Sequence, residues 1–184
     1  MKVYIALANG FEESEAILPY DILCRAGIET VWMSISSELE VVSTHGLCIR
    51  ADVLLSDTDT SDGDMIFLPG GMPGSSHLAE CKALATIISD YHNQGKYLAA
   101  ICAAPMVYGL QGLLKGKNAT CYPGFEDKLI GATPCQKSVV HDGQFITACG
   151  AGAAAELGAK MVEVLQNKEN ADNIIKQMMF GVYK

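Results

Sequence analysis

The chain has 184 residues, of which 49% are apolar and 18% are charged, and its formal net charge is −8. This size and apolar content suit one domain with a sizeable core, which we expect to span residues 1–184. The acidic balance argues against a nucleic-acid partner, and no apolar run approaches the roughly 20 residues of a membrane span or forms the core of a signal peptide.

Apolar runs of strand length alternate with helical segments along the chain. Strands are predicted at residues 3–8, 30–35, 65–68, 97–101, 119–121 and 144–148, with short strands or a hairpin between 41 and 55. Helices are predicted at residues 14–25, 76–93, 103–114, 152–166 and 170–180. Continuous apolar strands separated by helices indicate an α/β fold, with a mostly parallel sheet covered by helices on both faces.

Ligands of such sheets bind outside the carboxyl ends of the strands. Three loops with unusual chemistry leave strand ends in this chain: residues 9–15, residues 69–74 and the turn at Cys102. If their strands are neighbours, we expect these loops to converge on one site.

Cys102 stands between small residues where a predicted strand turns into a helix that has Pro105 in its first turn. The order small-x-nucleophile-x-small from Ala100 to Ala104 is typical of a nucleophile elbow, in which close packing demands small neighbours. Helix N–H groups and the helix dipole at this place favour thiolate over thiol. Cys102 is therefore the candidate nucleophile.

Gly70 and Gly71 directly follow a predicted strand, so their backbone can approach a ligand closely. With the amide of Ala103, this loop would form an oxyanion hole for a tetrahedral intermediate. A tight strand-to-loop turn is the alternative explanation of the glycine pair, and the pattern leaves it open.

Three glutamates, Glu12, Glu13 and Glu15, surround the start of the first helix. Acidic residues stabilise helix N-termini by about 0.3–1 kcal/mol each, which is one explanation of their presence. One of them pointing towards Cys102 would share a proton with the thiol, and a pocket would raise the pKa of that carboxyl. The spacing does not decide which glutamate does so.

The remaining thiols and imidazoles carry weaker signals. Seven cysteines without paired spacing favour reduced thiols in a cytoplasmic protein, and the absence of Cys-x-x-Cys and His-x-x-x-His predicts no metal site. Cys121 and Cys149 end predicted strands, so a resolving thiol near Cys102 is a minor alternative to simple packing. Among the histidines His77 is the best candidate for a catalytic base, although surface positions are the simpler explanation for all four.

The chain resembles the ThiJ/PfpI superfamily, in the branch that holds YajL and the parkinsonism-associated protein deglycase. The matching segments are residues 10–15, 21–28, 68–71 and 99–105, and the later Gly-Ala-Gly at 150–152 resembles a Gly-Pro-Gly. The resemblance implies a flavodoxin-like three-layer sandwich, a homodimer and no cofactor. It also implies Cys102 as the reactive cysteine, Glu15 as its carboxyl partner, and an anion pocket formed by the amides of Gly71 and Ala103.

Four departures from the family pattern are visible. Tyr122 stands where the parkinsonism-associated protein has a pocket histidine, and Cys149 and Ala151 replace an arginine and a proline. Ala103 follows the elbow cysteine where the proteases of the superfamily have a histidine, so a protease function is excluded. Glu15 would then carry the proton transfers alone, with Gly70, Tyr122 and Ala151 lining the pocket.

These residues lead to two hypotheses. The first is a cofactor-independent glyoxalase or deglycase that acts on methylglyoxal, glyoxal or their early adducts through Cys102, with a role in oxidative and carbonyl stress. The second is a redox-sensing cysteine protein or holdase chaperone with little turnover, in which Glu15 stabilises an oxidised Cys102. A hydrolase of unknown substrate in the same fold is a third possibility.

Overall fold

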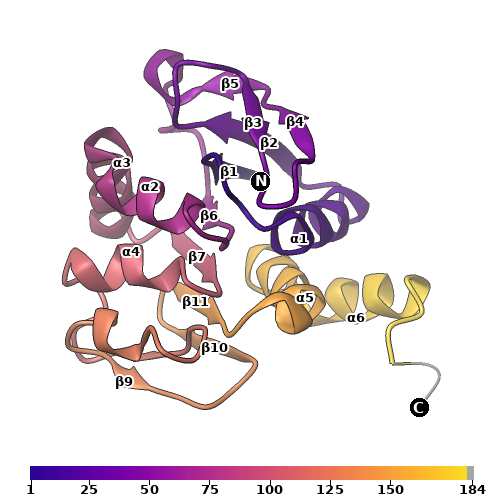
Figure 1. Ribbon diagram of the computed structural model, residues 1–184. Coiled ribbons are helices and arrows are strands. Elements are labelled where there is room, and N and C mark those ends of the chain that lie inside the picture. The colour runs from indigo at the N-terminus through magenta and orange to yellow at the C-terminus, as the bar shows by residue number, and fades with distance from the viewer. Residues whose placement is uncertain (182–184) are drawn as a thin grey trace.

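The computed structural model describes residues 1–181 and has a central seven-stranded sheet between two layers of helices (Figure 1). The strand order is β10-β11-β7-β6-β1-β2-β5, and every neighbouring pair is parallel except β10 with β11. The strands are β1 (Lys2–Leu7), β2 (Glu29–Ser34), β5 (Val53–Leu54), β6 (Met65–Leu68), β7 (Tyr97–Ile101), β10 (Val139–Asp142) and β11 (Phe145–Ala148). This confirms the α/β class and the flavodoxin-like three-layer architecture.

Two groups of helices cover the sheet (Figure 1). One face carries α1 (Glu13–Arg25), α5 (Ala154–Leu165) and α6 (Lys168–Gln177), and the other carries α2 (Gly74–Glu80), α3 (Lys82–Asn93) and α4 (Pro105–Leu110). Within residues 1–181, none of these helices is both long enough and apolar enough to cross a membrane.

The apolar character of the central strands explains why both faces are covered. Along β1, Val3 and Ile5 face the core under α1 and α5, whereas Tyr4 and Ala6 face the core under α3 and α4. Because successive side chains of a strand point to opposite faces, a continuous apolar run needs a helix layer on each side. All four residues of β6 are buried as well.

The central strands β7, β6 and β1 are neighbours, and this brings the three loops at their carboxyl ends together. The Glu12 amide donates to the Gly70 carbonyl at 2.9 Å, and the Gly74 amide donates to the Gly10 carbonyl at 3.2 Å. The expectation that these loops converge is confirmed.

The helix expected at 76–93 is two helices, which is a correction to the sequence prediction. The break lies at Cys81, whose backbone is extended, with φ −75° and ψ 100°. Helix α2 packs against α4 beside the loop after β6, whereas α3 lies over the sheet, and one straight helix could not do both. The helix expected to reach residue 114 ends at Leu110, because Gly112 adopts the left-handed conformation that ends helices.

Two further differences concern strands. The segment predicted as a strand at 119–121 forms only β8 (Asn118–Ala119), which pairs with β9 (Thr133–Pro134) in a separate two-stranded sheet. Strand β10 was not predicted; it forms an antiparallel hairpin with β11 through a turn at Gly143. The expected hairpin near Gly46 is present as β3 (Glu40–Val42) and β4 (Cys48–Arg50).

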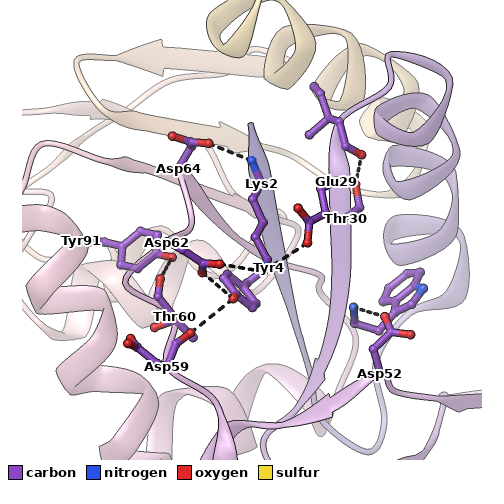
Figure 2. A network of polar contacts seen from close by, with 12 residues as sticks. Lys2, Tyr4, Glu29, Thr30, Asp52, Asp59, Thr60, Asp62, Asp64 and Tyr91 are labelled. Carbon is purple, nitrogen blue, oxygen red and sulfur yellow. Dashed lines mark hydrogen bonds and ion pairs between the residues drawn. The ribbon is translucent and has the colours of Figure 1, made fainter.

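A polar network lies near the amino ends of the central strands β1 and β6 (Figure 2). The Tyr4 hydroxyl donates to Asp62 at 2.7 Å, and Lys2 pairs with the same carboxylate at 2.9 Å. The Tyr91 hydroxyl of α3 donates to the Thr60 carbonyl at 2.6 Å. These bonds tie the loop before β6 to β1 and α3, far from the three converging loops.

Candidate active site

Cys102 occupies the turn between β7 and α4 and has a positive φ of 65°. Such a backbone is strained for a residue with a side chain, and it recurs at functional sites. Two hydrogen bonds hold it: the Cys102 amide donates to the Ala148 carbonyl at 2.9 Å, and the Tyr122 amide donates to the Cys102 carbonyl at 2.8 Å. Pro105 is in the first turn of α4, as predicted. The chain thus forms a nucleophile elbow that leaves the sulfur half-buried.

The backbone amides of Gly71 and Ala103 lie near the Cys102 sulfur and lower the pKa of its thiol. Gly71 has φ +92°, and a Cβ at this position would lie 2.6 Å from the Gly10 carbonyl oxygen. Only glycine lets the loop after β6 pass this close to the loop after β1 while its amide faces the sulfur. The glycine pair is therefore part of the site as well as a tight turn.

Glu15 is the glutamate that points to the thiol. Its side chain lies in the first turn of α1, is 1% exposed and lies beside Cys102, whose thiol lowers the pKa of the carboxyl. Gly70 makes this contact possible, because a Cβ there would lie 2.5 Å from the Cys102 Cβ and would also collide with the Glu15 carboxyl. The question that the spacing left open is thus decided by the fold.

The other two glutamates face elsewhere. Glu13 accepts a hydrogen bond from Ser43 and pairs with His45 at 3.0 Å, and the pairing lowers the pKa of Glu13 to about 2. Glu12 accepts a hydrogen bond from Ser14. Within the described residues, Glu12, Glu13 and His45 form the group whose ligand atoms lie close enough to hold a metal ion, and it lies outside the Cys102 turn.

Burial raises the pKa of Glu15 to about 7. The hydrogen bond to Cys102 and the backbone of Gly70 and Ala151 lower it, and the charge of Glu12 raises it. Removing a carboxylate from water disfavours its charged form, and few partners compensate here: Oε2 of Glu15 is buried without a hydrogen-bond partner. A carboxyl with this pKa exchanges its proton readily near neutral pH.

Burial also raises the pKa of the Cys102 thiol to about 12, and the charge of Glu15 and the hydrogen bond to it act in the same direction. The amides of Ala103 and Gly71 lower this pKa but do not outweigh burial. The amides thus favour the thiolate, as expected from the sequence, but burial and the charge of Glu15 favour the protonated thiol more strongly.

The two groups titrate as a pair. The carboxyl of Glu15 loses its proton near pH 7, and the thiol of Cys102 keeps its own proton at that pH because burial and the charge of Glu15 raise its pKa. Moving that proton from sulfur to carboxylate creates the thiolate without changing the charge of the site. The geometry thus suits a carboxylate that activates the thiol as it reacts.

Tyr122 and Ala151 border this pair. A Cβ added to Gly150 would lie 3.4 Å from the Tyr122 ring and 4.0 Å from Oε1 of Glu15, so Gly150 lies between these two side chains. The Tyr122 side chain is 51% exposed, so it stands at the mouth of the site.

Each of the four histidines has its contact elsewhere. His45 pairs with Glu13, His77 bonds to the Asn9 carbonyl, and His141 bonds to the Gly143 carbonyl. His92 packs against the ring of Phe145. The contact of His77 with the Asn9 carbonyl therefore does not support His77 as a base for Cys102.

Sequence reasoning missed Gly10 and Cys135. Gly10 has φ +86°, and a Cβ on it would lie 2.5 Å from the Pro73 side chain, so it allows the close approach of the first two loops. Its place after Asn9 was the available signal, because Asn-Gly marks turns. Cys135 lines a cavity together with Cys121 and Cys149, and no local pattern indicated this.

The chain is similar to several known proteins. The model of the DJ-1/PfpI family matches residues 1–164. Protein DJ-1 homolog B of Arabidopsis thaliana is 41% identical over 172 residues, which is 92% of this chain and 39% of that protein. The glutathione-independent glyoxalase DJR-1.2 of Caenorhabditis elegans is 33% identical over 91% of this chain and 89% of its own length.

Among solved structures, oxidized Toxoplasma gondii DJ-1 superposes with a TM-score of 0.94 and 36% identity, covering 98% of both chains. The chain spans less than half the length of the Arabidopsis relatives that it matches, at 39% and 45%.

Proposed function

Because this chain belongs to the DJ-1/PfpI family, we propose that it is a glutathione-independent glyoxalase that converts methylglyoxal or glyoxal, and their early adducts, through Cys102. The observation that carries this proposal is the buried carboxyl of Glu15 beside Cys102 at the elbow. The name of the nematode relative, a glutathione-independent glyoxalase, supports the same reaction class.

The reaction begins with the Glu15 carboxylate taking the thiol proton while the Cys102 sulfur adds to the aldehyde carbon. The product is a hemithioacetal, and the amides of Gly71 and Ala103 stabilise the negative charge that develops on its oxygen. Glu15 passes the thiol proton to this oxygen, which completes the hemithioacetal and frees the carboxylate again. The carboxylate then removes the hydrogen of the former aldehyde carbon and returns a proton to the neighbouring carbon, while the hydroxyl proton passes from the first oxygen to the second through the enediol, which leaves a thioester.

The resulting thioester is hydrolysed by water, which releases lactate from methylglyoxal and regenerates the thiol. The two carbons exchange oxidation states internally, so the balance is methylglyoxal plus water to lactate. No external oxidant or reductant is needed, which agrees with a cofactor-free reaction.

Lactate formation from methylglyoxal, without glutathione or other thiols, tests this proposal. Cys102→Ser and Glu15→Gln should each abolish turnover, whereas Cys24→Ser, at an exposed position on α1, should retain it. In D₂O the lactate should carry deuterium on the carbon next to the carboxylate, because Glu15 exchanges its proton with solvent. Undiminished turnover in either site variant would remove the mechanism.

A redox-sensing role of Cys102 is the second candidate, together with a holdase function that has little turnover. The buried, unpartnered Oε2 of Glu15 favours it, because this atom would share a proton with an oxygen added to the sulfur. Mass spectrometry after mild peroxide should then show two oxygens on Cys102, coupled to a change in chaperone activity. The homodimer implied by the family resemblance is also part of the proposal, and light scattering checks it.

A further inference from the structure

A cavity of about 390 Å³ lies between the loop of residues 120–126, the loop of residues 134–138 and Cys149, which directly follows β11. Three of the seven cysteines of the chain line it: Cys121, Cys135 and Cys149. The mechanism above uses none of these thiols. Pockets that bind small organic molecules begin at about this volume.

Backbone hydrogen bonds join the walls of this cavity, so its shape does not depend on a ligand. The Cys135 amide donates to the Ala119 carbonyl at 2.8 Å, which ties the two loops together. The Cys149 amide donates to the Ser138 carbonyl at 2.9 Å, which ties the end of β11 to the second loop. The three thiols therefore line one preformed cavity although they lie apart in the sequence.

The three thiols differ in what restrains them. Burial raises the pKa of Cys121 to about 11, and the charge of Glu126 acts in the same direction. The Cys135 thiol donates to the Thr133 carbonyl at 3.6 Å, and this contact is lost when the thiol ionises. Cys149 is half-buried, and among the described residues no hydrogen bond involves its sulfur. Because the thiolate is the nucleophile in sulfur chemistry, Cys149 is the thiol of this cavity that is best placed to react.

The three thiols do not form a metal site as they stand. Within the described residues, their sulfurs do not all lie within 4.8 Å of one another, whereas thiolates that share a zinc ion each lie about 2.3 Å from it. The space between them suits an organic group instead. At about 30 Å³ for each water molecule in the liquid, the cavity has room for about a dozen non-hydrogen atoms.

The rest of the lining is largely polar and carries charges of both signs. Lys137 and Glu126 are exposed at the rim, and Gln136 and Ser138 add hydrogen-bonding groups. A ligand with a carboxylate and an ammonium group can pair with both charged side chains, and hydrogen bonds between charged groups are the stronger ones. A half-cystine unit has these two groups, carries a sulfur and is smaller than the cavity.

We propose that Cys149 is a modification site, at which a small zwitterionic disulfide such as cystine exchanges with the thiol and leaves a cysteinyl group in the cavity. The ligand class is disulfides of cysteine or of similarly small amino-acid thiols. This inference concerns a site other than Cys102 and does not depend on the dicarbonyl reaction.

The exchange is balanced without any further oxidant. Cys149 loses its proton to water, its sulfur attacks one sulfur of the disulfide, and the bond between the two ligand sulfurs breaks. A new sulfur–sulfur bond joins Cys149 to one half of the ligand, and the other half leaves as a thiolate that takes up a proton. The ligand is thus the oxidant, because one bond between sulfurs is lost and one is gained.

Peptide mapping by mass spectrometry, after the reduced protein has been incubated with cystine, tests the proposal. Cys24 and Cys48 are exposed, so their modification measures what accessibility alone gives. Hydroxyethyl disulfide, which has no charged group, is the matched reagent. We expect the ratio of the modification rate at Cys149 to that at Cys48 to be about tenfold higher with cystine than with hydroxyethyl disulfide, because only cystine can pair with the charges at the rim.

Variants that fill the cavity give a second test. Ser138→Trp places a large ring on the exposed rim, and Gln136→Trp does the same if Ser138→Trp folds poorly. Ser76→Trp, in the groove between α2 and α4, is the matched control. Filling the cavity should lower the rate of cystine modification at Cys149 about tenfold and leave the rate at Cys48 unchanged, whereas Ser76→Trp should change neither.

Any of three results would overturn the proposal. The first is an equal ratio of the two rates with both reagents, and the second is a rate at Cys149 that neither filling variant lowers. The third is a disulfide between two thiols of the cavity with no cysteinyl group attached. A cysteinyl adduct that forms first on Cys149 and is lost in the filled variants supports the proposal, whether or not the protein consumes methylglyoxal.

Discussion

The carboxyl group of Glu15, in the first turn of α1, lies beside Cys102 at the turn after β7, and each of the two groups acts on the pKa of the other. The carboxyl is buried and the sulfur half-buried, and Gly70 leaves the space in which they meet. Burial disfavours the charged form of both groups, so it raises the pKa of the carboxyl and that of the thiol. The predictions below follow from this pair and from the fold that holds it.

The pH dependence of turnover should follow the pKa of Glu15. Because the carboxylate must accept the thiol proton, kcat/KM for methylglyoxal should rise with pH and level off above about 7. Glu12→Gln removes a charge that raises this pKa, so the midpoint should move to lower pH. A wild-type midpoint near 8.5, the pKa of free cysteine, would contradict the paired titration.

Glu15→Gln should make the protein more stable at alkaline pH. The pKa of Glu15 is about 7 in the folded protein and 4.5 without the fold, so folding favours the protonated form. The wild type therefore loses stability as pH rises from about 4.5 through 7, and Gln does not. The gain at pH 8 should approach about 3 kcal/mol and vanish at pH 4. Urea unfolding of both proteins at the two pH values measures it, and an equal difference at both would refute the linkage.

Gly70→Ala should separate the pair and impair turnover. The added Cβ would lie 2.5 Å from the Cys102 Cβ, and such overpacking costs about 1–3 kcal/mol. Gly152→Ala is the matched control, because nothing lies within 4 Å of its added Cβ. Thermal unfolding and lactate formation should both decline in the first variant and stay near wild type in the second. Equal behaviour of the two variants would show that the space at Gly70 is not required.

Tyr91→Phe should lower stability and leave turnover unchanged. The buried hydroxyl donates to the Thr60 carbonyl at 2.6 Å, and its loss costs about 1 kcal/mol, or about 2–4 °C in Tm. The network lies at the amino ends of the strands, opposite the elbow (Figure 2). Tyr122→Phe, at a half-exposed side chain, should leave Tm unchanged. If Tyr91→Phe turned over methylglyoxal more slowly than wild type at a temperature well below its Tm, this network and the site at the carboxyl ends of the strands would be coupled.

Local patterns predicted the central elements well. The strands near residues 3–8, 65–68 and 97–101 are present because an apolar run of this length has one stable place in such a protein, a strand between two helix layers. The break at Cys81 and the antiparallel strand β10 were missed, because both depend on what the segment packs against.

The sequence by itself determined the α/β class and the elbow at Cys102, because apolar periodicity and small residues around a nucleophile act over a few neighbouring positions. That the three loops meet depended on the order of the strands, which only the fold supplied. The tertiary structure alone decided which acid the thiol meets and how the pair titrates. Glu12, Glu13 and Glu15 are equivalent in local pattern, and only the packing of α1 against the loop after β6 buries one of them. Burial then outweighs the amides of Ala103 and Gly71 at Cys102, because desolvation depends on the whole fold around an atom.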